Sequence, residues 1–281
     1  MLFIIEAHSN LKMDFVNITS SSHSVKWVGV LNLTPDSFSD GGQFREFGGN
    51  FDLLEKAREM VLDGANVLDV GGESTGPGSP DVSLEEELQR VIPAIVLLRE
   101  AFPELILSID TWKSEVAKQA LQAGANWVND VTAGRGDPSM FDVVAQFAAS
   151  MVLMYSKQNS PRTNREVVHY EDVMGTVSAF LEERTLKARQ AGVRDLILDP
   201  GMGAFVSGDP AYSYELIERI EELRRLDCPL LVGSSRKGFL GEDRLGMTLW
   251  STLQLQNKVD YLRVHDVIEN ATVLGGPELE S

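Results

Sequence analysis

The chain alternates between short apolar runs and helix-patterned segments, and this alternation limits its possible folds more than any other feature. The runs are rich in Val, Leu and Ile, which is typical of parallel strands buried on both faces. Segments in which apolar residues recur with a helical period separate them. Strands are therefore expected at 27–32, 67–72, 105–110, 127–130, 151–155, 196–200, 230–235 and 261–266.

The segments between these runs carry the signals of helix ends. Ser83 and Glu86 have the spacing of a capping box, in which each side chain satisfies a backbone donor at a helix start. Gly64, Gly124 and Gly192 stand where helices should end before the next strand. Helices are therefore expected at 51–64, 84–101, 113–123, 138–148, 171–191, 210–226 and 247–257.

This order of elements predicts an α/β fold, a (β/α)8 TIM barrel, because eight alternating units in about 250 residues are the number that such a barrel requires. An open doubly wound sheet is the alternative, but it seldom has so many evenly spaced parallel strands. Only 15 residues follow Asp266, and they include Gly275 and Gly276, so we expect a short or incomplete last helix. The barrel should span residues 26–281, after an N-terminal extension or hairpin at residues 1–25.

Composition excludes several classes of protein. The formal net charge of −17, with no compensating basic stripe, argues against nucleic acid as a partner. The single cysteine, Cys228, excludes an intrachain disulfide and fits a reducing compartment. No apolar run approaches the roughly 20 residues of a membrane helix, and the apolar start of the chain is too short for a signal peptide. We therefore expect a cytoplasmic protein with no membrane partner.

Polar residues stand at or near the carboxyl ends of the predicted strands, the edge at which barrel active sites assemble. A single buried Asp is more often a structural group than a catalyst. Several Asp and Asn residues together with Lys237 favour a ligand site, because burying such groups without a partner is costly. The strand-end residues are Asn32, Asp69, Asp110, Asn129, Asp199, Ser235, Arg263 and His265.

These residue types suit a flat, hydrogen-bonding heterocycle that carries an anionic group. Carboxylates accept paired N–H donors from a ring edge, and an Asn side chain supplies both a donor and an acceptor. Arg263 could lay its guanidinium plane over an aromatic face. Thr75, the backbone amides of the glycine loop at 71–78 and His265 could receive phosphate oxygens. Glycine loops are common, so this last signal is weak alone.

Two longer motifs resemble the signatures of the dihydropteroate synthase family. Residues 32–42 (Asn-Leu-Thr-Pro-Asp-Ser-Phe-Ser-Asp-Gly-Gly) resemble the first signature and residues 69–75 (Asp-Val-Gly-Gly-Glu-Ser-Thr) the second. Asp110 and the segments 129–130, 199–201, 235–237 and 263–266 follow in the family's order, so the resemblance covers about residues 27–268. It implies a (β/α)8 barrel transferase of folate biosynthesis, which joins 6-hydroxymethyl-7,8-dihydropterin diphosphate to 4-aminobenzoate and releases diphosphate.

The resemblance also implies roles for individual residues. A pterin pocket would comprise Asp110, Asn129, Asp199 and Lys237, with Arg263 flanking the ring and Met154 beneath it; Asp110, Asp199, Lys237 and Arg263 form the expected catalytic set. The diphosphate would contact Asn32, Thr75, Arg263 and His265, with Asn32 helping to place the cofactor Mg2+. Ser235, Pro77 and Phe38 match positions around aminobenzoate. In the family, loops equivalent to 34–48 and 73–83 close over the diphosphate, and the barrels commonly form homodimers.

The sequence departs from the family pattern at three places. Gly76 replaces the Arg that usually follows the Glu-Ser-Thr triplet, so Lys157, Arg162 or another loop residue would have to supply that cation. Tyr155 replaces the usual His after Met154. Residues 202–207 resemble the sulfonamide-insensitive branch of the family, and with Gly76 they predict unusual discrimination between sulfonamides and aminobenzoate.

Three interpretations follow from these motifs. The complete pterin set favours an active dihydropteroate synthase. Gly76 is the main support for a second interpretation, a pterin-binding paralogue without synthase activity. A pterin-dependent methyltransferase barrel is the third; such barrels share the Asp and Asn pocket but lack the loop at 34–42.

Overall fold

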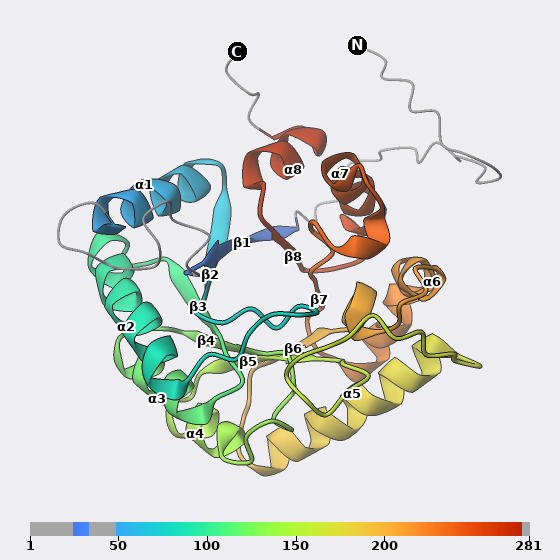
Figure 1. Ribbon diagram of the computed structural model, residues 1–281, viewed down its shortest axis with the longest axis horizontal. Helices are drawn as coiled ribbons and strands as arrows, with labels where there is room; N and C mark the ends of the chain where they lie inside the picture. Colours follow the sequence, from blue (N-terminus) through green and yellow to red (C-terminus); the bar gives the residue numbers. More distant parts are fainter. Residues whose placement is uncertain (1–24, 34–48, 277–281) are drawn as a thin grey trace.

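The computed structural model describes residues 25–33 and 49–276, in which strands and helices alternate around a barrel (Figure 1). The strands are β1 (Lys26–Asn32), β2 (Ala65–Gly71), β3 (Ile106–Asp110), β4 (Trp127–Asp130), β5 (Ser150–Met154), β6 (Leu196–Asp199), β7 (Leu231–Val232) and β8 (Tyr261–Val264). The helices are α1 (Gly49–Leu62), α2 (Leu84–Ala101), α3 (Ser114–Gln122), α4 (Met140–Gln146), α5 (Val173–Gln190), α6 (Ala211–Arg219), α7 (Arg244–Leu255) and α8 (Val267–Val273).

The sheet is parallel throughout and closes on itself. Strand β1 pairs with both β2 and β8, and the two strands at the ends of this order, β6 and β7, meet through an isolated bridge, which excludes the open sheet considered as an alternative. Only β6 and β7 lack a full ladder, because β7 is two residues long. A bridge between Leu198 and Leu230 joins them, and Leu198 N donates to Pro229 O over 2.9 Å. The predicted (β/α)8 barrel is thus confirmed.

An apolar cluster fills one end of the barrel. It takes one side chain from each strand, and Trp127 packs edge-on against Tyr261 with ring centroids 5.1 Å apart. Because side chains alternate between the two faces of a strand, the inward-facing position next along each strand lies two residues further on. The members of this cluster are Val28, Val67, Ile106, Trp127, Val152, Ile197, Leu231 and Tyr261.

That two-residue step places polar groups directly on the apolar cluster. Asp69 follows Val67 on β2 by two residues, and Arg263 follows Tyr261 on β8 in the same way. The intervening residues, such as Leu68 and Leu262, face the helices and belong to the main core. The barrel interior is therefore apolar at one end and polar toward the carboxyl ends of its strands.

The helix signals of the sequence hold, and one of the predicted helices is divided. Ser83 Oγ accepts a hydrogen bond from Glu86 N over 3.1 Å at the start of α2, and Gly64, Gly124 and Gly192 follow helices with φ of 104°, 112° and 99°. The helix predicted at 210–226 is divided into α6 and a 3-10 helix over Ile220–Leu226. The last helix, α8, forms with seven residues, as short as predicted.

Two predictions fall on parts of the chain that the structure does not describe. The expected extension or hairpin at residues 1–25 lies outside the described residues except for Val25, and so does the whole loop at 34–48. In the segments 25–33 and 49–276, no helix combines the length and apolarity needed to cross a membrane.

Candidate active site

A cavity of about 850 Å³ opens at the carboxyl ends of the strands. It gathers every predicted site residue of the described segments, although these come from elements all around the barrel. Phe38 lies outside the described residues. The predicted residues that line the cavity are Asn32, Thr75, Pro77, Asp110, Asn129, Met154, Asp199, Ser235, Lys237, Arg263 and His265.

Asp69 organises the floor of this cavity without lining it. Its Oδ2 accepts hydrogen bonds from Arg263 Nε over 2.6 Å and from Asn129 Nδ2 over 2.9 Å. Arg263 Nη2 donates onward to Asp110 Oδ2 over 2.7 Å. Burial alone would lower the pKa of Arg263, but the carboxylates of Asp69 and Asp110 outweigh it and hold that pKa above its usual value. Arg263 is thus a fixed cation between two acidic groups.

Two of the acidic groups that line the cavity, Asp110 and Asp199, have pKa values above the usual range. Burial raises the pKa of Asp110, and neighbouring carboxylates add to the rise while Arg263 opposes it. Burial also raises the pKa of Asp199, against the effects of Lys237 and of Gly201 N, which donates to Asp199 Oδ1 over 2.8 Å. Carboxyl groups of this kind suit ligand N–H donors, which would replace the water that burial removes.

The ammonium group of Lys237 lies over the ring of Phe205 in the cavity wall. Its Nζ stands 4.7 Å from the centre of the Phe205 ring, and burial lowers its pKa to about 8 although Asp199 acts in the opposite direction. Phe205 packs with Val131 and Met154 in a small buried apolar cluster. All three of these apolar residues also line the cavity, so they give it a flat, apolar wall beside the acidic groups.

Ser235 and His265 lie together at another part of the rim. Ser235 Oγ is 3.0 Å from His265 Nδ1 and accepts a hydrogen bond from His265 N over 3.2 Å. Burial, followed by the charges of Arg263 and Arg236, lowers the pKa of His265 to about 4. The imidazole is therefore neutral at pH 7, when it can donate one hydrogen bond to an anion.

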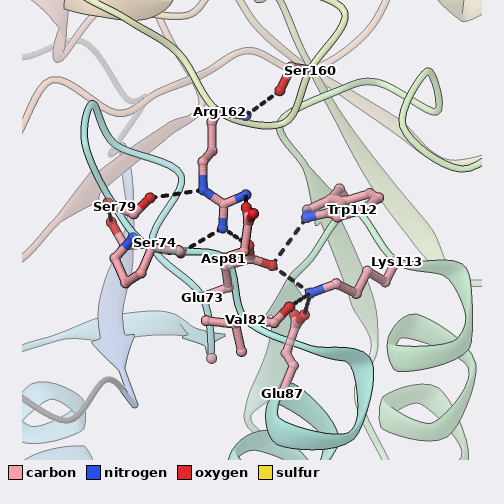
Figure 2. A network of polar contacts seen from close by, with 12 residues as sticks. Glu73, Ser74, Ser79, Asp81, Val82, Glu87, Trp112, Lys113, Ser160 and Arg162 are labelled. Carbon is pink, nitrogen blue, oxygen red and sulfur yellow. Dashed lines mark hydrogen bonds and ion pairs between the residues drawn. The ribbon is translucent and has the colours of Figure 1, made fainter.

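The loop between β2 and α2 is held by a network of charged groups (Figure 2). Glu73 Oε2 accepts hydrogen bonds from Lys113 Nζ over 2.6 Å and from Trp112 Nε1 over 3.1 Å. The other oxygen of Glu73 pairs with Arg162, which comes from the loop after β5. Lys113 also pairs with the fully buried Glu87 over 2.5 Å. Thr75 and Pro77 therefore stand on a loop that is anchored on both sides.

Two cations suggested as replacements for the missing Arg at position 76 do not line the cavity. Arg162 is engaged by Glu73 and Asp81 and donates to Ser79 O over 3.1 Å. Lys157 Nζ donates to two backbone carbonyls, Asn164 O over 3.1 Å and Glu166 O over 2.6 Å. Both candidates thus hold loops together instead of facing the cavity.

The cavity also contains residues that the sequence did not single out. Arg165 and Arg244 line it, although no signature motif contains them. Conversely, Asp130 belongs to a motif but turns away, because its carboxylate accepts hydrogen bonds from Thr132 N and Gly134 N, both over 2.7 Å. Tyr155, which replaces a usual His, is also turned away: its hydroxyl lies 3.1 Å from that of Tyr170.

A metal ion has few protein ligands available in the described part of the cavity. Residues 25–33 and 49–276 contain no group of three or more His, Cys, Asp or Glu residues that could hold one. Asn32 lines the cavity at the end of β1, and its Oδ1 lies beside Gly71, next to Asp110. A single amide oxygen suits Mg2+ that is bound mainly through phosphate oxygens and water, so the residues present fit a metal carried by a ligand.

Fold and cavity together define a class: a (β/α)8 barrel enzyme with a polar cavity at the carboxyl ends of its strands. The chain matches the family described as "Pterin binding enzyme" over residues 28–265. It belongs to this family.

Several relatives are known by function or structure. The chain is 40% identical over 251 residues to the dihydropteroate synthase of Synechocystis sp., covering 85% of this chain and 84% of that protein. It is 42% identical over 264 residues to the folic acid synthesis protein fol1 of Schizosaccharomyces pombe; this match covers 88% of the chain but only 35% of fol1, so the chain spans about a third of that relative. The dihydropteroate synthase of Xanthomonas albilineans, solved with 4-aminobenzoic acid, superposes with a TM-score of 0.80 at 36% identity, over 90% of this chain and 91% of that one.

Proposed function

We propose that the chain is a dihydropteroate synthase of folate biosynthesis, which joins 6-hydroxymethyl-7,8-dihydropterin diphosphate to 4-aminobenzoate and releases diphosphate. The observation that carries this proposal is that one cavity is lined by all five of the expected polar residues: Asp110, Asn129, Asp199, Lys237 and Arg263. Relatives that are named dihydropteroate synthases and match most of this chain support the same conclusion.

The acidic groups of the cavity would bind the pterin ring through its N–H donors. The raised pKa values of Asp110 and Asp199 indicate carboxyl groups short of solvation, which paired N–H donors would supply. Asn129 is oriented for the same task by its hydrogen bond to Asp69. Met154 and Val131 would cover one face of the ring.

The reaction would need electrostatic help but no nucleophilic side chain. The C–O bond between the pterin methylene and the diphosphate breaks, and a carbocation stabilised by the ring nitrogens forms. The aniline nitrogen of 4-aminobenzoate attacks this carbon and loses a proton. Arg263, His265 and Thr75 would bind the departing diphosphate. Asn32 would hold Mg2+ together with diphosphate oxygens, and the metal charge would neutralise the leaving group.

The test is diphosphate release from dihydropterin diphosphate, Mg2+ and 4-aminobenzoate. We expect release that requires 4-aminobenzoate and that falls by at least about a hundredfold in Asp110→Asn, because the amide no longer accepts two N–H donors. Asp142→Asn, on the exposed face of α4, is the matched control and should retain activity. Release by the Asp110→Asn variant at the parent rate would contradict the assignment.

The two alternative interpretations give different results in the same experiment. A pterin-binding paralogue without synthase activity would bind pterin in calorimetry but release no diphosphate. A pterin-dependent methyltransferase barrel would bind pterin and require a corrinoid partner. The similarity to named synthases along most of the chain favours the synthase over both.

Sulfonamide response is a further property of this site to be measured. Met202, Ala204, Phe205 and Ser207 from the unusual segment line the cavity, as does Gly76. We expect the sulfonamide inhibition constant, divided by the Michaelis constant for aminobenzoate, to exceed the same ratio in a sulfonamide-sensitive synthase. A ratio equal to that of such an enzyme would contradict this expectation. The cytoplasmic location and the homodimer stay predictions.

A further inference from the structure

Arg165, in the loop between β5 and α5, is a cation at the cavity without a partner in the described part of the chain. It lines the cavity, and no hydrogen bond or ion pair of its guanidinium with residues 25–33 or 49–276 is present. The other arginines at the rim are engaged. Arg236 pairs with Asp266, and Arg244 Nη1 donates to Arg236 O over 3.0 Å. Arg263 is held by its acidic neighbours.

The backbone that carries Arg165 is fixed against the loop after β6. Gly208 N donates to Glu166 O over 2.9 Å, and Ser207 Oγ donates to Val168 O over 2.9 Å. The contact at Gly208 is so close that a Cβ there would lie 2.2 Å from Arg165 O. The side chain of Arg165 is exposed, and a fixed backbone limits the positions that its guanidinium can reach.

The same loop also contacts the loop after β2, next to Gly76. Thr163 N donates to Thr75 O over 3.3 Å, and Thr163 Oγ1 donates to Ala204 O over 2.7 Å. Arg165 is two residues beyond Thr163. The loop thus brings the Arg165 cation to the side of the cavity where Gly76 supplies none.

The position of Arg165 in the barrel indicates which anion it meets. The proposed diphosphate ligands Asn32 and His265 belong to β1 and to the end of β8, which are neighbours in the sheet. Arg165 follows β5, and in an eight-stranded ring β5 lies across from β1. An anion near Arg165 therefore lies away from Asn32 and His265, although Thr75 borders the same loop through its carbonyl. The carboxylate of the second substrate also lies away from the diphosphate, since its amino group faces the reacting carbon.

We propose that Arg165 binds the carboxylate of 4-aminobenzoate and supplies the cation that Gly76 lacks. The planar guanidinium can donate two parallel hydrogen bonds to a carboxylate, which gives direction as well as attraction. The carboxylate is remote from the bond that forms, so Arg165 is a binding and specificity residue. This inference rests on the proposed synthase reaction.

The test compares Arg165→Gln with the parent protein in steady-state kinetics. We expect the Michaelis constant for aminobenzoate to rise about tenfold, equal to about 1.4 kcal/mol of lost binding. The Michaelis constant for dihydropterin diphosphate should be unchanged. Arg165→Lys should recover part of the lost affinity for aminobenzoate, since it restores the charge but not the paired N–H donors of the guanidinium. Inhibition by 4-aminobenzamide, which has no carboxylate, should be equal in the parent and in Arg165→Gln.

Arg194→Gln is the matched control, because Arg194 is exposed and precedes β6 at the opposite end of the barrel. An unchanged Michaelis constant for aminobenzoate in Arg165→Gln would overturn the inference while an active parent upholds the proposed function. A rise confined to the Michaelis constant for dihydropterin diphosphate would overturn it too, by assigning Arg165 to the diphosphate. If the parent has no turnover, the proposed function fails, and calorimetric binding of 4-aminobenzoate to parent and variant decides the inference by the same tenfold difference.

Discussion

Arg263 Nε donates to Asp69 Oδ2 over 2.6 Å, which joins β8 to β2 across 194 positions of the sequence. The Asp69 side chain is 1% exposed and that of Arg263 is 18% exposed. Arg263 Nη2 also reaches Asp110, on the cavity side. A residue that lines no part of the cavity thus orients a guanidinium in the proposed pterin and diphosphate site.

We predict that Asp69→Ala lowers the free energy of unfolding by about 3 kcal/mol, since removing one partner leaves a mostly buried charge less compensated. Asp110 still pairs with Arg263, which limits the loss. Chemical denaturation measures the effect. Glu183→Ala is the control, because its ion pair with Lys187 is about half exposed and should contribute less than about 1 kcal/mol. Equal effects of the two substitutions would contradict the prediction.

We predict that Arg162→Ala speeds hydrogen exchange in residues 73–83 and lowers stability by about 1–2 kcal/mol. Arg162 joins this loop through Glu73, Asp81 and Ser79 O. Glu73 keeps its bond to Lys113, so the substitution frees the loop without leaving that carboxylate unpaired.

The control for this prediction is Arg58→Ala, which removes an exposed arginine that pairs with Glu55 on α1. It should change stability by less than about 1 kcal/mol. Exchange in residues 73–83 that remains at the parent rate in Arg162→Ala would show that other contacts hold the loop.

Gly76→Arg should lower the Michaelis constant for aminobenzoate or for dihydropterin diphosphate several-fold, because it adds a cation at the cavity. Among the described residues, a Cβ at this position would meet only Ser74 Oγ at 3.6 Å and Ser79 Oγ at 3.8 Å, which are ordinary contacts. Gly76→Gln separates the charge from the added bulk and should lower neither constant. Equal kinetics of the two variants would mean that the added charge does not reach a substrate.

Stability should depend on pH through His265. Its pKa is lowered to about 4 by burial and by the charges of Arg263 and Arg236, whereas an unfolded imidazole titrates near about 6.5. Between these values the unfolded chain binds a proton at this position and the folded chain does not. The free energy of unfolding therefore rises with pH from about 4 to 6.5, by up to about 3 kcal/mol from this group.

Denaturation of His265→Gln over this pH range tests the effect. The variant should gain stability relative to the parent as the pH falls, because it lacks the group that takes up a proton on unfolding. His169→Gln, which removes an exposed imidazole from the loop after β5, is the control and should follow the parent. A constant difference between parent and His265→Gln at all pH values would contradict the assignment.

Much of the fold could be predicted because its signals are local. Apolar runs, Ser83 and the glycines at helix ends act within a few residues of themselves, and the strand starts and ends lie within two residues of prediction except at the end of β7. Strand β7 is shorter because only Leu231 and Val232 form a ladder with β8, and the following residues turn into the cavity rim. No run of residues could signal that the barrel closes there through one bridge.

The sequence alone determined which residues could reach one edge of the barrel. A strand alternates its side chains with a period of two, so Asn129 and Asp199 at strand ends must face the same interior once the strands are parallel. The sequence did not determine which charged side chains form ion pairs or hydrogen bonds with other residues. Arg162 and Arg165 are the same residue type and stand three positions apart. Arg162 is bound to Glu73, whereas Arg165 lines the cavity with no partner among the described residues. Only the tertiary structure decided this, because the partners of a charged side chain come from segments that are remote in sequence.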